Sequence, residues 1–315
     1  MQLKLKHLMY CPFTGLGLYN GFRGNRWLRN RIKIFKQFVI PSLQAQTCQD
    51  FILWMSWRRE ERNNPIVKEF VEYLKSTSIK NFHTFNGLCF YDDKHPDEEA
   101  KERLVNSIHT SMGEVLNNIG ECDYILMTIQ PSDDLYHKNA VAEIQRILST
   151  TKLQAIGFTK GFMCNYLTKE TAEYNPTTNP PFYTIKFPRE VFENPQLHCQ
   201  YTSLKMDVGK YKIGTPCPSH EYVGNCLKYG KMEVRGFLVG CHGYNVSTVF
   251  NHPFKGKTVN QEVLKDFGIY DTPLLKIRFS LRKRLLRMLP FHIQKKIRYW
   301  IGERFFNYLY NFLRN

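Results

Sequence analysis

Short strand-like runs alternate with longer helical runs over the first 130 residues of the sequence. Four apolar runs have the length and composition of strands: Leu3 to Tyr10, Phe51 to Trp57, Ile79 to Phe85 and Tyr124 to Ile129. This alternation is typical of a domain whose sheet is largely parallel. The sequence therefore predicts an α/β fold with a mixed, mainly parallel sheet.

Between these strands, apolar side chains recur every three or four residues. From Trp27 to Leu43 they predict a helix that turns Phe35 and Phe38 toward the sheet. The Asn64-Pro65 pair is suited to the N-cap and first turn of a second helix. A third helix, with acids in its first turns, is expected from Asp97 to Ile119.

The second half of the chain has a different sequence pattern, in which aromatic strand-like runs are separated by turn residues. We therefore divide a domain of residues 1–270 into a nucleotide-binding half, residues 1–150, and an acceptor half, residues 151–270. Residues 271–315 form a separate basic tail, which holds eleven Lys or Arg and only two acids. This tail supplies more than half of the net charge of +16.

The composition of the sequence predicts the cellular location of the protein. No run reaches the roughly 18 uncharged apolar residues of a spanning helix, and the N-terminus lacks an apolar leader segment. The nine cysteines are odd in number and include no Cys-x-x-Cys pair, so reduced, mostly buried thiols are expected. We expect a cytoplasmic protein, peripheral at a membrane through its tail.

The tail predicts two amphipathic helices broken at Pro290. In the second, one apolar face is formed by Ile293, Ile297, Trp300, Ile301, Phe305, Tyr308, Leu309 and Phe312. Aromatic residues with Lys and Arg suit a helix that lies on an anionic membrane surface. The alternative is that this face packs on the domain or on a second subunit of a homo-oligomer. Nucleic acid is not expected, because it would leave the apolar face without a role.

The strand that ends at Ile129 runs directly into Gln-Pro-Ser-Asp133-Asp134. In an open α/β sheet, ligands bind at the carboxyl ends of the strands. Two carboxylates there can hold a divalent cation that bridges phosphate oxygens, and such oxygen ligands suit Mg²⁺ or Mn²⁺. The alternative is an Asx turn that caps a helix starting at Tyr136.

A longer pattern runs through the first helix and the second strand: Arg31-x-x-x-Phe35-x-x-Phe38-x-x-Pro41-Ser42-Leu43-x-x-Gln46-Thr47-x-x-Asp50-Phe51-x-x-Trp54. It resembles a family of rhamnosyltransferases with the GT-A type of domain. The resemblance covers about residues 3–255 and continues through Pro181-Phe182-Tyr183-Thr184, His220 and His242-Gly-Tyr-Asn245. It implies an inverting, divalent-metal-assisted glycosyltransferase. The donor would carry a deoxyhexose such as rhamnose on dTDP or UDP, and the acceptor would be a glycan or glycolipid.

The resemblance and the residues together suggest roles at the site. The metal ligands would be Asp133, Asp134 and His242, and the donor would be bound by Thr14, Arg31, Asp133 and Asn245. Glu221 is the candidate base for the acceptor hydroxyl, with Asp207 as a fallback, and Asp134 is the second catalytic residue. Four of them have a simpler reading: His242 as a structural histidine, Asn245 as a turn residue with left-handed backbone geometry, Arg31 as a solvated or helix-pairing base, and Glu221 as a surface glutamate.

The sequence departs from the family at Pro131, which stands where an aspartate begins the usual Asp-x-Asp-Asp motif. This leaves two alternatives open. The first is a GT-A-like protein without activity that binds a membrane or nucleic acid. The second is a nucleotidyltransferase, for which Gly15, Gly17, Gly21 and Arg23 near the first strand fit in part.

Overall fold

A computed structural model describes residues 3–11, 13–14, 24–57, 61, 63–79, 81–86, 110, 113–193, 206–208, 211–213, 220–243, 245, 250, 252–270 and 272–277. The basic tail from residue 278 onward, and most of the helix expected over residues 97–119, lie outside these residues. The glycines at positions 15, 17 and 21 also lie outside them.

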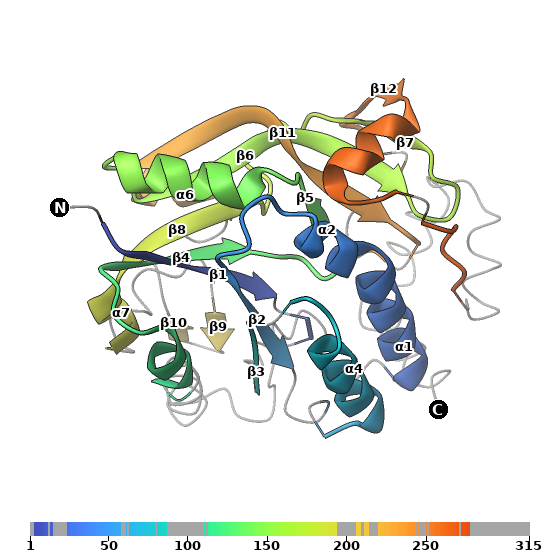
Figure 1. Ribbon diagram of the computed structural model, residues 1–315. Coiled ribbons are helices and arrows are strands. Elements are labelled where there is room, and N and C mark those ends of the chain that lie inside the picture. The colour runs from blue at the N-terminus through green and yellow to red at the C-terminus, as the bar shows by residue number, and fades with distance from the viewer. Residues whose placement is uncertain are drawn as a thin grey trace.

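The N-terminal half of the sheet is parallel (Figure 1). Its strands are β1 (Leu5–Cys11), β2 (Ile52–Trp57), β3 (Phe82–Asn86) and β4 (Tyr124–Ile129), in the order β4-β1-β2-β3. β1 pairs in parallel with both β2 and β4, so that Leu8 lies opposite Ile52 on one side and Met127 on the other. The four strands predicted from the sequence are all confirmed, and their carboxyl ends share one edge of the sheet.

Antiparallel pairing dominates the C-terminal half, which follows the predicted loss of βα alternation. β8 (Tyr183–Pro188) pairs with β4, and β6 (Ala155–Asn165) pairs with β8. The long strand β11 (Tyr229–Cys241) lies parallel to β6. The remaining strands are β5 (Leu135–Tyr136), β7 (Thr171–Tyr174), β12 (Lys255–Val259) and a separate pair, β9 (Met206–Val208) with β10 (Tyr211–Ile213). The structure thus confirms a mixed α/β fold.

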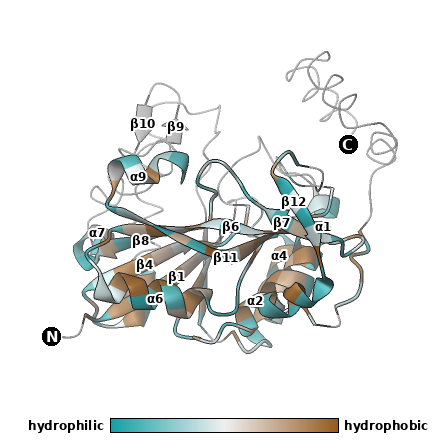
Figure 2. Cartoon of the chain, turned by 90° about the horizontal axis from the view of Figure 1, so that it is seen from above, coloured by the Kyte–Doolittle hydropathy of each residue, from teal (hydrophilic) through white to brown (hydrophobic). Residues whose placement is uncertain are grey.

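Helices α2 (Ile40–Gln44), α4 (Pro65–Lys75) and α6 (Ala140–Thr150) cover one face of the sheet, and the short α9 (Val223–Cys226) lies on the other (Figure 2). α7 (Arg189–Glu193) follows β8 directly, and 3₁₀ turns occupy His220–Tyr222 and Gln261–Phe267. The predicted start of α4 is confirmed, because the Asn64 side chain accepts a hydrogen bond from the Ile66 amide.

The first predicted helix is confirmed as one continuous helix with a π-helical segment near its middle. α1 (Asn25–Ile34) passes through a π-helical segment, Phe35–Val39, into α2. The Ile40 amide donates to the carbonyl of Phe35, five residues back. Pro41 has no amide to donate to the carbonyl four residues before it, so the turn widens just ahead of it.

One prediction near the site is wrong. The helix expected from Tyr136 begins only at Ala140, because Leu135–Tyr136 forms the short strand β5, which pairs with Leu238 and Phe237 of β11. The Asp133-Asp134 turn therefore leads into a strand and does not cap a helix.

Candidate active site

A short turn after β4 carries the two aspartates at the carboxyl edge of the sheet. The Gln130 side chain holds this turn closed, because its Nε2 donates to the carbonyls of Pro131, at 2.8 Å, and Asp134, at 2.9 Å. The hydroxyl of Tyr166 donates to the carbonyl of Asp133 at 2.9 Å, and the Tyr166 ring stacks on Phe38 at 3.8 Å between centroids. The turn is thus fixed through its backbone, and both carboxylates remain partly exposed.

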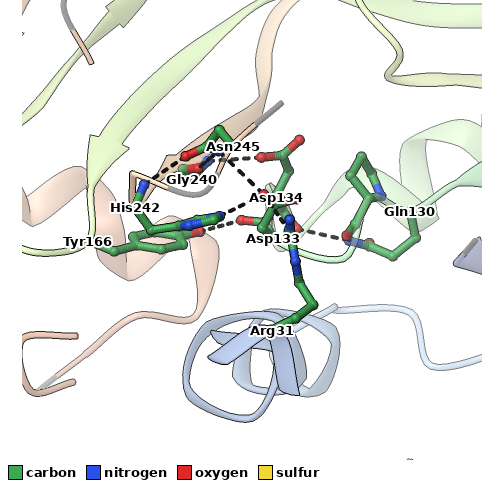
Figure 3. Close-up of polar contacts among 9 residues, drawn as sticks. Arg31, Gln130, Asp133, Asp134, Tyr166, Gly240, His242 and Asn245 are labelled. Carbon is green, nitrogen blue, oxygen red and sulfur yellow. Dashed lines mark hydrogen bonds and ion pairs between the residues drawn. The ribbon is translucent and has the colours of Figure 1, made fainter. Parts of the chain in front are cut away.

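One carboxylate oxygen, Oδ2 of Asp133, is the centre of the cluster (Figure 3). Nη1 of Arg31 forms an ion pair with it at 2.5 Å, and Nε2 of His242 lies 2.8 Å away. Nδ2 of Asn245 donates to the same oxygen at 3.3 Å. Residues separated by more than 200 positions in the sequence thus converge on one atom.

Arg31 reaches the cluster from helix α1. Its guanidinium lies 5.3 Å from the ring centroid of Trp27, one turn earlier on the same helix. Only 6% of the Arg31 side chain is exposed, against 15% for Asp133. The reading of Arg31 as a solvated surface charge is therefore wrong, since a buried guanidinium needs a partner such as this carboxylate.

His242 and Asn245 come from the end of β11 and the turn that follows it. The His242 amide donates to Oδ1 of Asn245 at 2.8 Å, while Nδ2 of Asn245 donates to the carbonyl of Gly240 at 2.5 Å. The Asn245 side chain therefore links the backbone of Gly240 and His242 and also contacts Asp133, but its backbone does not have the left-handed geometry of the simpler reading. His242 is fully buried.

The second aspartate is held by backbone. Oδ1 of Asp134 accepts a hydrogen bond from the Gly240 amide at 2.9 Å. A Cβ on Gly240 would lie 2.2 Å from the carbonyl oxygen of Asp133 and 2.4 Å from the Tyr166 ring, so only glycine permits this close approach.

The two carboxyl groups differ in their affinity for protons. Burial alone would raise the pKa of Asp133, but the charge of Arg31 and the hydrogen bond from His242 outweigh it and hold the pKa well below its usual range. Burial, and next the negative charge of Asp133, raise the pKa of Asp134 well above its usual value. A pair whose pKa values are pushed apart in this way is typical of functional sites.

A divalent ion does not fit the side chains as they are arranged. Oδ2 of Asp133 already contacts Arg31, His242 and Asn245, and Oδ1 of Asp134 accepts a hydrogen bond from the Gly240 amide. Among the residues that the structure describes, no three His, Cys, Asp or Glu side chains are grouped to hold a metal ion. Asp133, Asp134 and His242 therefore lie together, but they are engaged with protein partners and are not arranged as metal ligands.

Two of the predicted site residues make contacts with other parts of the domain. The Thr14 amide donates to the carbonyl of Ser56, which links the segment after β1 to the end of β2. Glu221 is exposed, and its carboxylate lies 3.4 Å from the hydroxyl of Thr178. The roles of both residues stay predictions. Asp207 lies in β9, where only the backbone is described.

Three residues of the site were missed by the sequence reasoning: Gln130, Tyr166 and Gly240. A glycine within a strand signals a close backbone approach, so Gly240 had a signal that could have found it. Nothing local marks Tyr166, because its role depends on the pairing of β6 with β11, which brings it beside the aspartate turn.

No known protein family matches this sequence, and no curated protein does either. Solved structures with a partly similar fold include residues 1–349 of S. aureus TarS, at 12% identity over 75% of this chain, with a TM-score of 0.38. The same TarS fragment in complex with UDP-GlcNAc gives 11% identity over 74% of this chain and a TM-score of 0.32. A protein of Desulfovibrio desulfuricans G20, described as a nucleotide-diphospho-sugar transferase, gives 14% identity over 75% of this chain and 80% of its own length, with a TM-score of 0.34.

This chain covers 60% and 59% of the TarS fragment in the two structures. Structural similarities this low in TM-score and sequence identity do not assign the chain to a family or to an activity.

Among the described residues, no helix is long and apolar enough to cross a membrane.

Proposed function

We propose that this protein is a glycosyltransferase that transfers a sugar from a nucleoside-diphosphate sugar to a hydroxyl acceptor. The observation that carries the proposal is the cluster of Asp133, Arg31 and His242 around one oxygen at the carboxyl end of β4. Ligands of open α/β sheets bind at this edge. The resemblance of the sequence to GT-A rhamnosyltransferases agrees with the chemistry that such a cluster can perform.

In the proposed reaction, the acceptor oxygen attacks the anomeric carbon of the donor sugar. The bond from that carbon to the diphosphate oxygen breaks, and its electron pair leaves with the nucleoside diphosphate. The acceptor proton passes to a carboxylate base, for which Glu221 is the candidate. Preorganised positive charge and N–H donors stabilise the departing diphosphate, and the guanidinium of Arg31 is placed to contribute both.

The finer parts of the proposal come from the sequence. Rhamnose on dTDP or UDP as donor, a glycan or glycolipid as acceptor, and inversion of configuration all follow from the family resemblance. The resemblance also implies a divalent cation, Mg²⁺ or Mn²⁺, but the arrangement of the aspartates and His242 described above does not fit one. The basic tail is proposed to bind anionic membrane and to keep the enzyme near a lipid-linked acceptor.

Thermal unfolding with UDP, dTDP and GDP, each tested alone and with its sugar conjugates, tests the donor class. One nucleoside diphosphate should raise the melting temperature, since a ligand that binds only the folded state stabilises it by mass action. Asp133→Asn should weaken that effect, because it removes the charge that positions Arg31. No response to any nucleotide would contradict the proposal and would favour the alternative of a GT-A-like protein without activity.

A further inference from the structure

We propose that Arg31, and not a divalent metal ion, supplies the positive charge at this donor site. The inference rests on the proposed function and specifies how the site would accept a diphosphate. It departs from the metal-assisted mechanism that the sequence resemblance implies. Four features of the cluster carry it.

The first feature is how Oδ2 of Asp133 is occupied. A carboxylate oxygen has two lone pairs, and this one already meets Arg31, His242 and Asn245 at 2.5, 2.8 and 3.3 Å. A Mg²⁺ ion would need to approach to about 2.1 Å. It would displace a guanidinium that is buried and lies over the Trp27 ring.

The second feature is the orientation of His242. A carboxylate that is ionised only accepts hydrogen bonds, so Nε2 of His242, which lies 2.8 Å from Oδ2 of Asp133, must carry the proton. His242 consequently cannot use Nε2 to ligate an ion that it shares with that aspartate.

The third feature concerns the other potential ligands. Asn245 presents its amide nitrogen to Asp133, because its oxygen accepts from the His242 backbone. Oδ1 of Asp134 accepts from the Gly240 backbone. Pro131 stands at the position where the resembling family has one more carboxylate. Among the described residues, one oxygen on each aspartate is thus left for an ion, and the cluster offers no third side-chain ligand to complete the site.

The fourth feature is the chemistry of the guanidinium. Arg31 offsets the charge of Asp133, so a diphosphate does not face two uncompensated carboxylates. A guanidinium carries five N–H donors and binds two phosphate oxygens at once. Because the Arg31 side chain is already held over the Trp27 ring, such binding would cost it little conformational freedom. Arg31 would thus fulfil both tasks of the metal, charge compensation and orientation.

The wild-type protein tests this inference without any variant. The protein is freed of metal with EDTA, and its melting temperature is measured with UDP, dTDP or GDP, once in EDTA and once in about 1 mM Mn²⁺. We expect the same stabilisation in both conditions. A response that appears only with Mn²⁺ would overturn the inference and leave the proposed function standing, whereas no response in either condition would overturn both.

Mn²⁺ binding measured by electron paramagnetic resonance gives a second, independent readout. Without nucleotide, the wild-type protein should leave the signal of free Mn²⁺ unchanged. Binding of Mn²⁺ that Asp133→Asn abolishes would overturn the inference whatever the nucleotide result.

Variants then test Arg31 itself. Arg31→Gln should lose at least tenfold in nucleotide affinity in EDTA, and Arg31→Lys should recover part of it, because it restores the charge without the paired donors. The matched control is Arg146→Gln, which removes an exposed arginine paired with Glu143 on α6 and should bind as the wild type does. Unchanged binding by a folded Arg31→Gln variant would overturn the inference.

Discussion

At the scale of single residues, two sets of polar side chains in the protein interior show how specific partners hold them. Arg31 and Asp133 form the first, at the candidate site. The second is His7 of β1, which is fully enclosed in the sheet. Its Nδ1 faces Nε2 of Gln145, a donor, so its Nε2 carries the proton and donates to Thr128, 2.7 Å away. His7 is therefore neutral in the folded protein.

This arrangement predicts a pH-dependent stability. Burial lowers the pKa of His7 to about 3, so the unfolded chain binds a proton below about pH 6.5 that the folded protein does not. The free energy of unfolding should therefore fall as pH drops from 6.5 toward 3, by about 1.4 kcal/mol per pH unit from this residue. Between pH 7.5 and pH 5.5, the free energy of unfolding measured by urea denaturation should fall less for His7→Gln than for the wild type. Parallel losses in the two proteins would show that His7 is not buried as described.

At the scale of elements, the helix over residues 25–44 joins the core to the site. Phe35, in its π-helical segment, lies 5.4 Å from the ring of Phe13 and 5.6 Å from that of Phe70. Phe38 stacks on Tyr166, which in turn holds the aspartate turn. Helical periodicity was sufficient to predict that both phenylalanines are buried, as they are. It could not predict the π turn or the contact of Arg31 with Asp133, since both depend on packing between distant segments.

Phe35→Ala should destabilise the protein by about 3–5 kcal/mol, because it leaves a cavity inside this aromatic cluster. The measurement is the free energy of unfolding from urea denaturation. Tyr73→Ala is the control, since Tyr73 is an exposed aromatic residue on α4 and should cost much less. Equal losses for the two variants would contradict the packing described for Phe35.

The end of β11 gives a second prediction at this scale. Gly240→Ala would place a methyl group against the Asp133 carbonyl and the Tyr166 ring, so the aspartate turn must shift. We expect the fold to be kept and the nucleotide affinity to fall at least tenfold. A misplacement of about 1 Å in a catalytic group can lower the reaction rate by more than this, so a shift of the aspartate turn should also weaken binding. Gly113→Ala is the control, as its added Cβ would meet no atom within 4 Å. Wild-type affinity of Gly240→Ala would show that the turn does not position the site.

At the scale of the whole molecule, the alternation of strands and helices was sufficient to predict the parallel half of the sheet. The C-terminal half could not be predicted in detail, because the long pairing of β6 with β11 joins segments about 75 residues apart and has no local signal. The site lies where these two halves meet: Asp133 and Arg31 come from the first half, His242 and Asn245 from the second. Sequence reasoning named all four residues but could not arrange them.

The chain beyond residue 270 was predicted to be a separate tail, and its first residues lie on the domain. Leu275 is buried, and its amide donates to the carbonyl of Tyr166. Lys33 donates to the carbonyl of Lys276, and Gln37 to that of Pro273. A truncation that tests the tail should therefore end at Ile277.

We predict that full-length protein sediments with anionic vesicles and that the protein ending at Ile277 does not. Each basic residue near a charged leaflet contributes about 1 kcal/mol, and salt should weaken the binding. Neutral vesicles are the control. Equal, salt-insensitive recovery of both proteins would contradict membrane binding by the tail, and aggregation of the shortened protein would support packing of the tail on the domain or on a second subunit.

The central claim is that Asp133 and Asp134 form the donor site of a glycosyltransferase. The most direct measurement is release of nucleoside diphosphate from a panel of nucleotide sugars by the wild type and by Asp134→Ala, with circular dichroism to confirm the fold. We predict slow release from one donor by the wild type and a loss of at least about 100-fold in the variant, because Asp134 ties the aspartate turn to the Gly240 amide and its loss would misplace the Arg31–Asp133 pair. Asp123→Ala, which removes a carboxylate next to the opposite end of β4, should keep wild-type activity. Near-normal release by folded Asp134→Ala would contradict the account.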